Sequence, residues 1–328
     1  MSHPLDPALL AEARALQDDM IIVNGLDASL LNEEVVRTLK AGGVHMNMST
    51  LPDLSLSSPF HQFMLDHADD LTPVTTVAGI HAARAAGKVA VGYCWQWVDV
   101  DEDLSQLAGY HRIGLRSSGL VYNVGNYIGS GCVDPNPGPL SRYGIQVVEA
   151  LQDLRIVVDI GGHCSEATSY DVLQVAEGPV VCSHTNPLAL RDNPRAMTDG
   201  LMRAIADTGG VIGIAAFNFF VVAEGQASLE DFLRQFDHMI DVVGVEHVGL
   251  GLDQIIGRND AGPVNPITLP PEAYPQRYED WIYVEGLHDF TGVPLITAGL
   301  MERGYSPEDI EKIMGANWLR VWEEVWGE

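Results

Sequence analysis

The chain has 328 residues, of which 46% are hydrophobic, and a formal net charge of −27 at pH 7. A surface this negative repels nucleic acids and anionic membranes, so we expect neither as a partner. No run approaches the roughly 20 uninterrupted apolar residues of a membrane span, and the start lacks the basic-then-apolar pattern of a secretory signal. Four cysteines without C-x-x-C spacing predict free thiols in a reducing cytoplasm.

Short Val/Ile-rich runs alternate with longer amphipathic runs along most of the chain. Continuous apolar runs of this kind are typical of parallel strands that helices cover on both faces. The predicted strands are 20–24, 44–50, 89–94, 119–122, 156–160, 180–183, 211–215 and 247–252. Eight such units favour a closed (β/α)8 TIM-like barrel over an open doubly wound sheet. The turn after the first strand also lacks a Gly-rich dinucleotide fingerprint.

Amphipathic periodicity predicts helices between these strands, at 31–40, 141–154, 198–207 and 229–243. A further helix near the C-terminus has a clear start, because Ser306 can cap it, Pro307 fits its first position and Asp309 can bond back to the cap. Gly315 is expected to end it. We therefore expect residues 1–328 to form one barrel domain. Irregular segments suited to the barrel mouth lie near 51–70, 122–139 and 257–280.

Two histidines follow successive predicted strands. His163 lies in Asp159-Ile160-Gly161-Gly162-His163, and His184 lies in Val181-Cys182-Ser183-His184. Asp253 ends the last predicted strand. Imidazoles and a carboxylate at strand ends meet at the mouth of an α/β barrel, where they can hold a metal ion. The competing interpretations are hydrogen-bonded core histidines, or a metal-free pocket in which the histidines act as acid and base.

Several segments together resemble the renal (membrane) dipeptidase family of metallopeptidases. They are 138–144 (GPLSRYG), the two histidine segments, Arg195 with Thr198-Asp199, 247–253, and 303–306 through 315–320. The likeness runs from about residue 20 to the end. It implies a metal-dependent hydrolase barrel, frequent homodimers, and hydrolysis of dipeptides at a two-zinc centre.

The resemblance also implies roles for individual residues. His163 and His184 fall where the family places the two imidazoles of its second zinc. Arg195 falls where an arginine binds substrate, and its planar guanidinium suits a substrate carboxylate. Asp253 falls where a carboxylate ligates the first zinc and assists proton transfer. Tyr122 stands where the family has a substrate-binding histidine.

The match is incomplete at the other metal ligands. Leu26 and Ala28 stand where the first strand of the family supplies an imidazole and a carboxylate, and an ungapped count puts Trp95 at its bridging glutamate. None of these side chains can ligate a metal. Among residues that could compensate, His45 would approach the centre if the polar side of its strand faces the barrel interior. We expect it instead to be a buried structural histidine. Cys94 and Asp27 are further candidates.

The predicted function is that of a dipeptidase-like metallohydrolase. It would hydrolyse a small amide that carries a carboxylate, using one divalent metal, zinc, on His163, His184 and Asp253. Two alternatives remain open. One is a divergent branch with lyase, isomerase or amidase chemistry, with or without metal, and the other is a non-catalytic protein that binds a small ligand. We expect a small-molecule partner, a homodimer and a cytoplasmic location.

Overall fold

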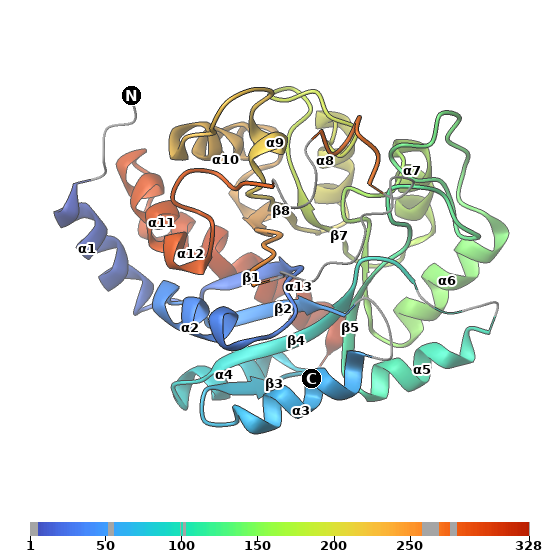
Figure 1. The fold of residues 1–328 in the computed structure, drawn as a ribbon. Helices are drawn as coiled ribbons and strands as arrows, with labels where there is room; N and C mark the ends of the chain where they lie inside the picture. Colours follow the sequence, from blue (N-terminus) through green and yellow to red (C-terminus); the bar gives the residue numbers. More distant parts are fainter. Residues whose placement is uncertain are drawn as a thin grey trace.

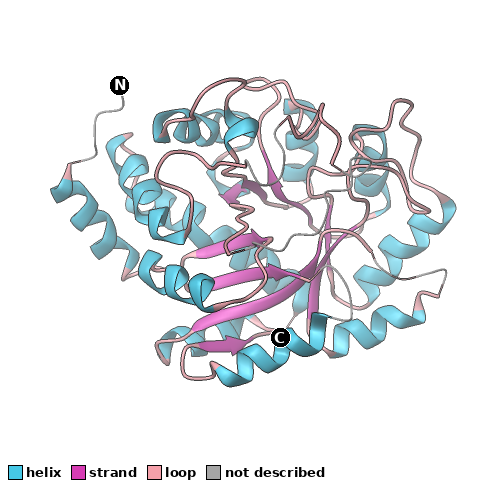
Figure 2. Ribbon diagram, viewed as in Figure 1, coloured by secondary structure: helices cyan, strands magenta, loops and turns pink. Residues whose placement is uncertain are grey.

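A computed structural model describes residues 6–51, 56–98, 100, 103–257, 269–275 and 281–327. Its centre is a ring of parallel strands surrounded by helices (Figures 1 and 2). The strands follow the order β1-β2-β4-β5-β6-β7-β8-β9, and β3 pairs with β4 outside this path. Their bounds are β1 Val23–Asp27, β2 Met46–Thr50, β3 Leu71–Pro73, β4 Val89–Trp95, β5 Leu115–Gly119, β6 Val157–Asp159, β7 Val180–Thr185, β8 Ile212–Ile214 and β9 Val248–Leu250.

The ring is closed where the first strand meets the end of the last. Asp27 and Gln254 form a parallel bridge, and the N–H of Ala28 donates to the carbonyl of Gln254 at 3.0 Å. The side chain of Asn24 accepts a hydrogen bond from the N–H of Leu252 at 2.9 Å. The chain thus forms the predicted (β/α)8 TIM-like barrel, nearly closed, which confirms the fold class.

Helices cover the outside of the ring (Figure 2). α10 spans the predicted 229–243, because Ser228 and Asp231 form a reciprocal capping box at its start. None of the helices in the described part of the chain is long and apolar enough to cross a membrane. The helices are α1 Pro7–Gln17, α2 Glu33–Gly42, α3 Ser57–Asp66, α4 Val77–Ala85, α5 Ser105–Arg112, α6 Arg142–Asp153, α7 Glu166–Val175, α8 Asp199–Asp207, α9 Asn218–Val221, α10 Leu229–Val243, α11 Val293–Glu302, α12 Pro307–Glu311 and α13 Asn317–Trp326.

Three strands differ from the prediction. β1 is Val23–Asp27, three residues later than the predicted 20–24. β5 is Leu115–Gly119 and ends where the predicted strand 119–122 begins. Three polar residues, 116–118, occupy its middle, so a search for apolar runs passed over it. β3 is only three residues long and lies beside β4, outside the ring. The shift at β5 matters for function, because it moves Tyr122 out of the strand into the loop at the barrel mouth.

The C-terminal helix begins and ends as predicted. The side chain of Ser306 accepts from the N–H of Asp309 at 3.1 Å. At Gly315 the backbone leaves helical geometry, with φ 179° and ψ −36°, so the helix ends in a kink there. A second helix, α13, begins two residues later. A glycine is needed there because a Cβ at 315 would lie 1.9 Å from the carbonyl oxygen of Ile21.

α13 closes the amino-terminal end of the barrel. Trp318, Trp322 and Trp326 share one hydrophobic cluster with inward-facing residues such as Met46 and Met48. The indole N–H of Trp318 donates to the carbonyl of Leu250 at 2.9 Å. The barrel is therefore filled from below by tryptophan, and open space is left at the other end, where the strands finish.

Candidate active site

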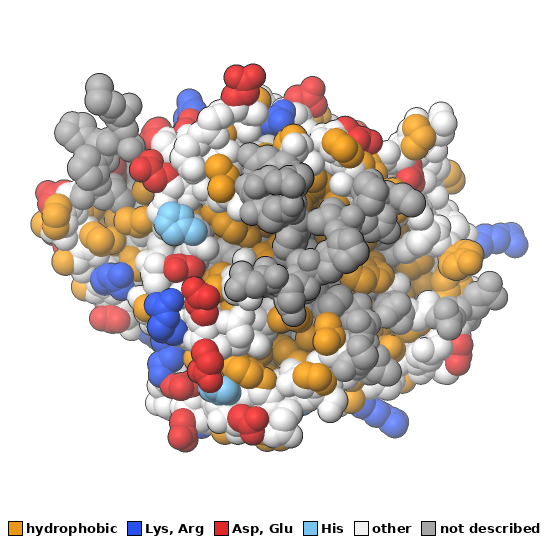
Figure 3. All heavy atoms as spheres, viewed as in Figure 1, with side chains coloured by type: hydrophobic (Ala, Val, Ile, Leu, Met, Phe, Trp, Pro, Cys, Tyr) orange, Lys and Arg blue, Asp and Glu red, His pale blue; other side chains and the backbone are white. Residues whose placement is uncertain are grey.

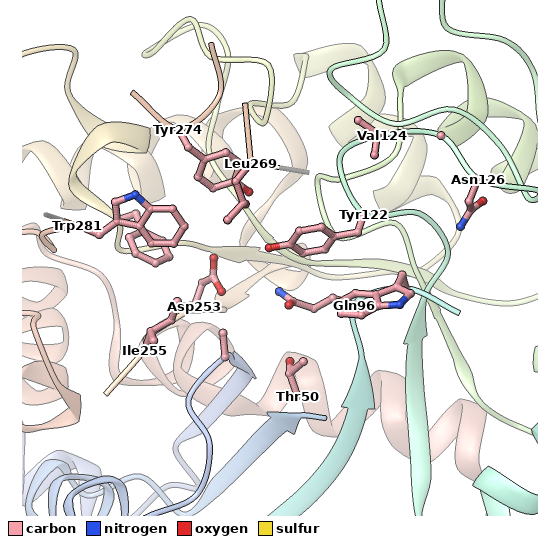
Figure 4. A pocket seen from close by; sticks show the side chains of 14 residues that line it. Thr50, Gln96, Tyr122, Val124, Asn126, Asp253, Ile255, Leu269, Tyr274 and Trp281 are labelled. Carbon is pink, nitrogen blue, oxygen red and sulfur yellow. The ribbon is translucent and has the colours of Figure 1, made fainter. Parts of the chain in front are cut away.

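A cavity of 520 Å³ lies at the carboxyl ends of the strands. Thr50 ends β2, Gln96 follows β4, and Asp253 follows β9, so the lining comes from several strands, as in other α/β barrels. On the face drawn in Figure 3, hydrophobic side chains gather in the centre and charged ones lie mostly at the rim. The lining residues are Ala28, Thr50, Gln96, Trp97, Tyr122, Val124, Gly125, Asn126, Phe217, Asp253, Ile255, Leu269, Tyr274 and Trp281 (Figure 4).

The two predicted histidines meet beside this cavity. His163 and His184 are buried, at 1% and 0% exposure, and their Nε2 atoms are 2.9 Å apart. Burial, with the nearby positive charge of Arg195, holds the pKa of both imidazoles well below its usual range, so both are neutral. The sequence prediction that these side chains converge is confirmed by this distance.

Hydrogen bonds on the far side of each ring decide where the ring protons lie. His163 Nδ1 is 2.8 Å from Asn123 Oδ1, which can only accept, so His163 carries its proton on Nδ1. His184 Nδ1 is 2.8 Å from Ser183 Oγ. The Ser183 side chain also bonds Asp159. While Asp159 is ionised, Ser183 donates to it and accepts from His184 Nδ1–H.

With Asp159 ionised, neither Nε2 carries a proton, and the two atoms lie 2.9 Å apart. Gln96, whose amide nitrogen is 3.4 Å from His184 Nε2, is consistent with a lone pair there. Two unprotonated imidazole nitrogens are donors that a divalent ion such as zinc commonly takes, at roughly 2.0–2.1 Å from each nitrogen. This donor set fits one ion. It does not fit the family's two-zinc centre, because Leu26, Ala28 and Trp95 carry no donor.

The turn between the histidines depends on glycine. Gly161 and Gly162 both have left-handed backbones, with φ of 53° and 66°. A Cβ on Gly162 would lie 2.6 Å from Arg195 Nη1 and 3.0 Å from the carbonyl oxygen of His184. The N–H of Gly161 donates to Asp159 Oδ1 at 2.8 Å. The Gly-Gly pair therefore lets His163, His184 and Arg195 approach one another.

Asp253 follows β9 and lines the cavity. Its backbone is left-handed, with φ 53°, and its carboxylate points into the cavity (Figure 4). Burial raises its pKa to about 7, a rise that Arg195 opposes and Asp27 increases. Among the described residues, no three His, Cys, Asp or Glu side chains are grouped closely enough to hold a metal. The structure thus brings His163 and His184 together without placing Asp253 in the same cluster.

Arg195 is buried behind the cavity wall. Its Nε donates to the Tyr274 hydroxyl at 3.0 Å, and its Nη1 donates to the carbonyl of Gly161 at 3.0 Å. The guanidinium also lies over the ring of Phe220, 5.4 Å from its centre. Arg195 therefore does not line the cavity itself but holds Tyr274, which does.

Tyr122 lines the cavity, and its hydroxyl is directed toward Asp253 (Figure 4). Its ring lies 4.3 Å from that of His163, tilted by 32°. Burial raises the pKa of its hydroxyl well above the usual range, and the nearby Tyr274 and Asp253 raise it further, so Tyr122 is neutral. Tyr122 therefore belongs to the cavity wall, and its role in substrate binding stays a prediction.

The residues considered as compensating ligands lie elsewhere. His45 Nδ1 accepts from the N–H of Ile22 at 3.0 Å, at the amino-terminal end of the barrel, so it is structural. Asp27 accepts from Asn47 and from the N–H of Ser29 at the barrel seam. Burial raises the pKa of the Cys94 thiol above its usual range, which makes it a poor metal ligand.

Other site residues were not predicted. Asn123 and Ser183 orient the imidazoles, and Gln96, rather than Trp95, reaches them from the end of β4. Trp95 faces outward, 4.3 Å from the ring of Tyr110. Ser183 could have been found from its place beside His184 in the sequence. Tyr274 comes from an irregular segment whose pattern carries no such signal.

Comparison with known proteins agrees with this architecture. The model of the family Membrane dipeptidase (Peptidase family M19) matches residues 50–261 and 280–326. The chain therefore belongs to this family of dipeptidase-like hydrolases.

Two curated relatives are similar over most of the chain. An uncharacterized protein in the pqqA 5′ region of Klebsiella pneumoniae is 32% identical over 236 residues, covering 69% of this chain and 78% of that protein. An uncharacterized dipeptidase of Schizosaccharomyces pombe is 30% identical over 270 residues, covering 80% of this chain. The match spans only 57% of the length of the yeast protein.

Solved structures share the fold. An amidohydrolase from Pseudomonas aeruginosa superposes with a TM-score of 0.90 at 25% identity, covering 96% of this chain and 99% of that one. Dipeptidase AC, a metallopeptidase of family M19, superposes with a TM-score of 0.76 at 22% identity, over 94% of this chain and 99% of that one. The second likeness shows the barrel alone.

Proposed function

We propose that this protein hydrolyses an amide bond in a small substrate that carries a carboxylate. The observation that carries the proposal is a buried carboxylate, Asp253, that faces a 520 Å³ cavity with two neutral imidazoles beside it. A cavity of this size accommodates a small molecule of dipeptide dimensions. Membership of a dipeptidase family supports the reaction class.

In this proposal Asp253 handles the proton. With a pKa of about 7, a large share of the group is ionised at neutral pH, and its protonated form remains a competent acid. Asp253 would take a proton from the attacking water and return it to the leaving amine. Tyr122, a neutral donor directed toward Asp253, would bind the amide oxygen or orient the carboxyl group.

His163 and His184 would hold one divalent ion, zinc, through their Nε2 atoms. Such an ion supplies Lewis acidity and lowers the pKa of water. Asn123 and Ser183 would keep both Nε2 lone pairs directed at the ion. Arg195, which lies behind the cavity wall, would act on substrate binding through Tyr274, whose hydroxyl its Nε holds at the cavity surface.

The proposal is tested by zinc analysis of the purified protein together with turnover on a panel of dipeptides and N-acyl amino acids. We expect close to one ion per chain and hydrolysis of at least one panel member. His184→Ala should lose both. His238→Ala removes a surface imidazole that pairs with Asp199 and serves as the matched control, which should retain both. A wild-type chain that binds no metal and is inert on the whole panel contradicts the proposal.

A cytoplasmic homodimer is the remaining part of the proposal. All four cysteines are free, which suits a reducing compartment. The family resemblance supports the dimer. Light scattering at micromolar concentration tests it, and a mass of one chain, 35.6 kDa, contradicts it.

A further inference from the structure

The wall of the cavity is unusually rich in aromatic rings. Five of the lining side chains are aromatic, and they come from segments far apart in the sequence: Trp97, Tyr122, Phe217, Tyr274 and Trp281. No lysine, arginine or histidine is found among the described residues that line it. The described lining therefore offers ring faces and acceptor oxygens, and none of its side chains is cationic.

The rings form two groups. Trp97 and Tyr122 pack edge to face, with centroids 5.2 Å apart and planes at 65°. Tyr274 and Trp281 are stacked at 5.2 Å, and Phe217 meets Trp281 at 5.1 Å and 79°. Figure 4 shows Tyr274 and Trp281 on one side of Asp253 and Tyr122 on the other. A ligand group that occupies the space between them is faced by rings on both sides.

Asp253 gives this space its charge. The residue is 7% exposed, and its carboxylate faces the cavity. The buried guanidinium of Arg195 lowers the pKa of Asp253 from behind the wall, but its Nε and Nη1 are directed at Tyr274 and Gly161. A buried carboxylate is costly to keep ionised, and a cationic ligand beside it would relieve that cost.

We propose that the substrate carries an alkylated ammonium group, which sits between the two groups of rings and faces Asp253. Ring faces attract a cation through their quadrupoles, and alkyl groups on the nitrogen fill the space against them. A primary ammonium would instead need three acceptors, which rings supply poorly. A neutral apolar group would leave the carboxylate unpaired.

This inference deepens the proposed function and rests on it for the identity of the reacting bond. The bound cation would also keep Asp253 ionised, which is the form that accepts a proton. The substrate class is thus a small N-alkylated ammonium compound with a carboxylate and an amide.

Binding to the full-length protein tests the inference without any need for turnover. The probes are choline, its neutral isostere 3,3-dimethylbutan-1-ol, and ethanolamine, titrated by calorimetry. We expect choline to bind at least about tenfold more tightly than either of the others, which is the size of effect a desolvated cation–π site gives. Equal affinity for choline and the neutral isostere overturns the inference.

Variants locate the effect. Asp253→Asn keeps the side-chain shape and should remove most of the preference for choline, and Trp281→Leu keeps apolar bulk and should weaken it. Tyr127→Ala, which removes an aromatic ring that is 79% exposed, is the matched control and should bind choline as the wild type does. Retention of the preference in both cavity variants would assign choline to another site and refute the proposal.

The two proposals fail separately. Preference for choline without hydrolysis of any amide leaves the cation site standing and refutes the hydrolase. Hydrolysis of uncharged N-acyl amino acids, with no preference for choline, supports the hydrolase and refutes the cation site.

Discussion

Asp253 is well placed for proton transfer, but burying its carboxylate lowers the stability of the folded protein. Its pKa rises from 3.8 to about 7 on folding, mainly because burial disfavours the charged form. The folded state therefore binds this proton more tightly than the unfolded state between about pH 4 and pH 7. Folding stability falls as the pH rises through that window, and the loss is complete above pH 7.

Asp253→Asn should therefore make the protein more stable at pH 8 while it reduces turnover to a small residual rate. The amide has the same shape and no charge to desolvate. We expect a higher Tm than the wild type at pH 8 and nearly the same Tm at pH 4, measured by calorimetry. A lower Tm of Asp253→Asn at pH 8 would show that the carboxylate has a stabilising partner.

The same pKa predicts the pH dependence of turnover. If ionised Asp253 is the base, kcat/KM should rise about tenfold per pH unit below pH 7 and level off above it. Initial rates between pH 5 and 9 measure this, and the rising limb should be missing from the residual activity of Asp253→Asn. A limb that persists in the variant assigns the base to another group.

Ser183 is expected to act through His184 on the metal. Ser183→Ala removes the hydroxyl that fixes Nδ1 and should lower zinc affinity by about 10- to 100-fold, the range for partners of metal-bound histidines. Competition with a chelating dye measures this. Ser169→Ala is the control, because Ser169 is a buried serine that bonds its own helix at the carbonyl of Ser165. Equal losses in both variants would mean general destabilisation.

At the scale of the element, the turn after β6 needs glycine for two reasons, its left-handed backbone and the close approach of neighbouring atoms. A left-handed glycine elsewhere in the chain meets only the first of these. Gly162 and Gly225 are both left-handed, with φ of 66° and 78°. A Cβ on Gly225 would have no neighbour within 4 Å, whereas one on Gly162 would collide with Arg195. The two positions therefore separate backbone strain from crowding.

Gly225→Ala should cost about 1 kcal/mol in the free energy of unfolding, from the left-handed backbone alone. Gly162→Ala should cost about 1–3 kcal/mol more, because the Cβ displaces Arg195 or His184. Urea unfolding of both variants measures the difference. Equal losses of unfolding free energy in the two variants would show that the turn after β6 shifts readily to admit a side chain at position 162.

The helices and strands also show which parts of the fold can be predicted from the sequence. The apolar runs located seven of the ring strands, because a strand buried on both faces has few polar residues. α10 was found to the residue from its amphipathic periodicity. β5 was misplaced since Arg116, Ser117 and Ser118 interrupt its run. The histidine pair was predictable because successive strand ends are neighbours.

The rest of the site was not predictable in this way. The direction of the Asp253 side chain depends on the left-handed backbone of Asp253 itself, which no sequence pattern announces. Tyr274 and Trp281 reach the cavity from irregular segments without periodicity. Part of the predicted mouth segment 257–280, namely 258–268 and 276–280, lies outside the described residues, as do 52–55 of the segment 51–70.

For the whole molecule, a net charge of −27 should make stability depend on salt. Like charges repel most in the compact state, and salt screens that repulsion. We expect the Tm to rise by at least about 2 °C between 10 and 200 mM NaCl, which for a domain of this size corresponds to roughly 1 kcal/mol. Calorimetry at fixed pH measures this. A Tm that falls with added salt would show that attractive ion pairs outweigh the repulsion.

The tryptophan helix that fills the barrel from below has a consequence for biosynthesis. Trp318, Trp322 and Trp326 follow every strand of the ring in the sequence, so a ribosome makes them after the strands that they cover. Before this helix is made, the inner faces of the strands at the amino-terminal end of the barrel lack the tryptophans that cover them, and the nascent chain exposes that hydrophobic surface. A premature stop codon before residue 318 should therefore yield a chain that chaperones retain and proteases degrade, even though every strand and both imidazoles have already been made.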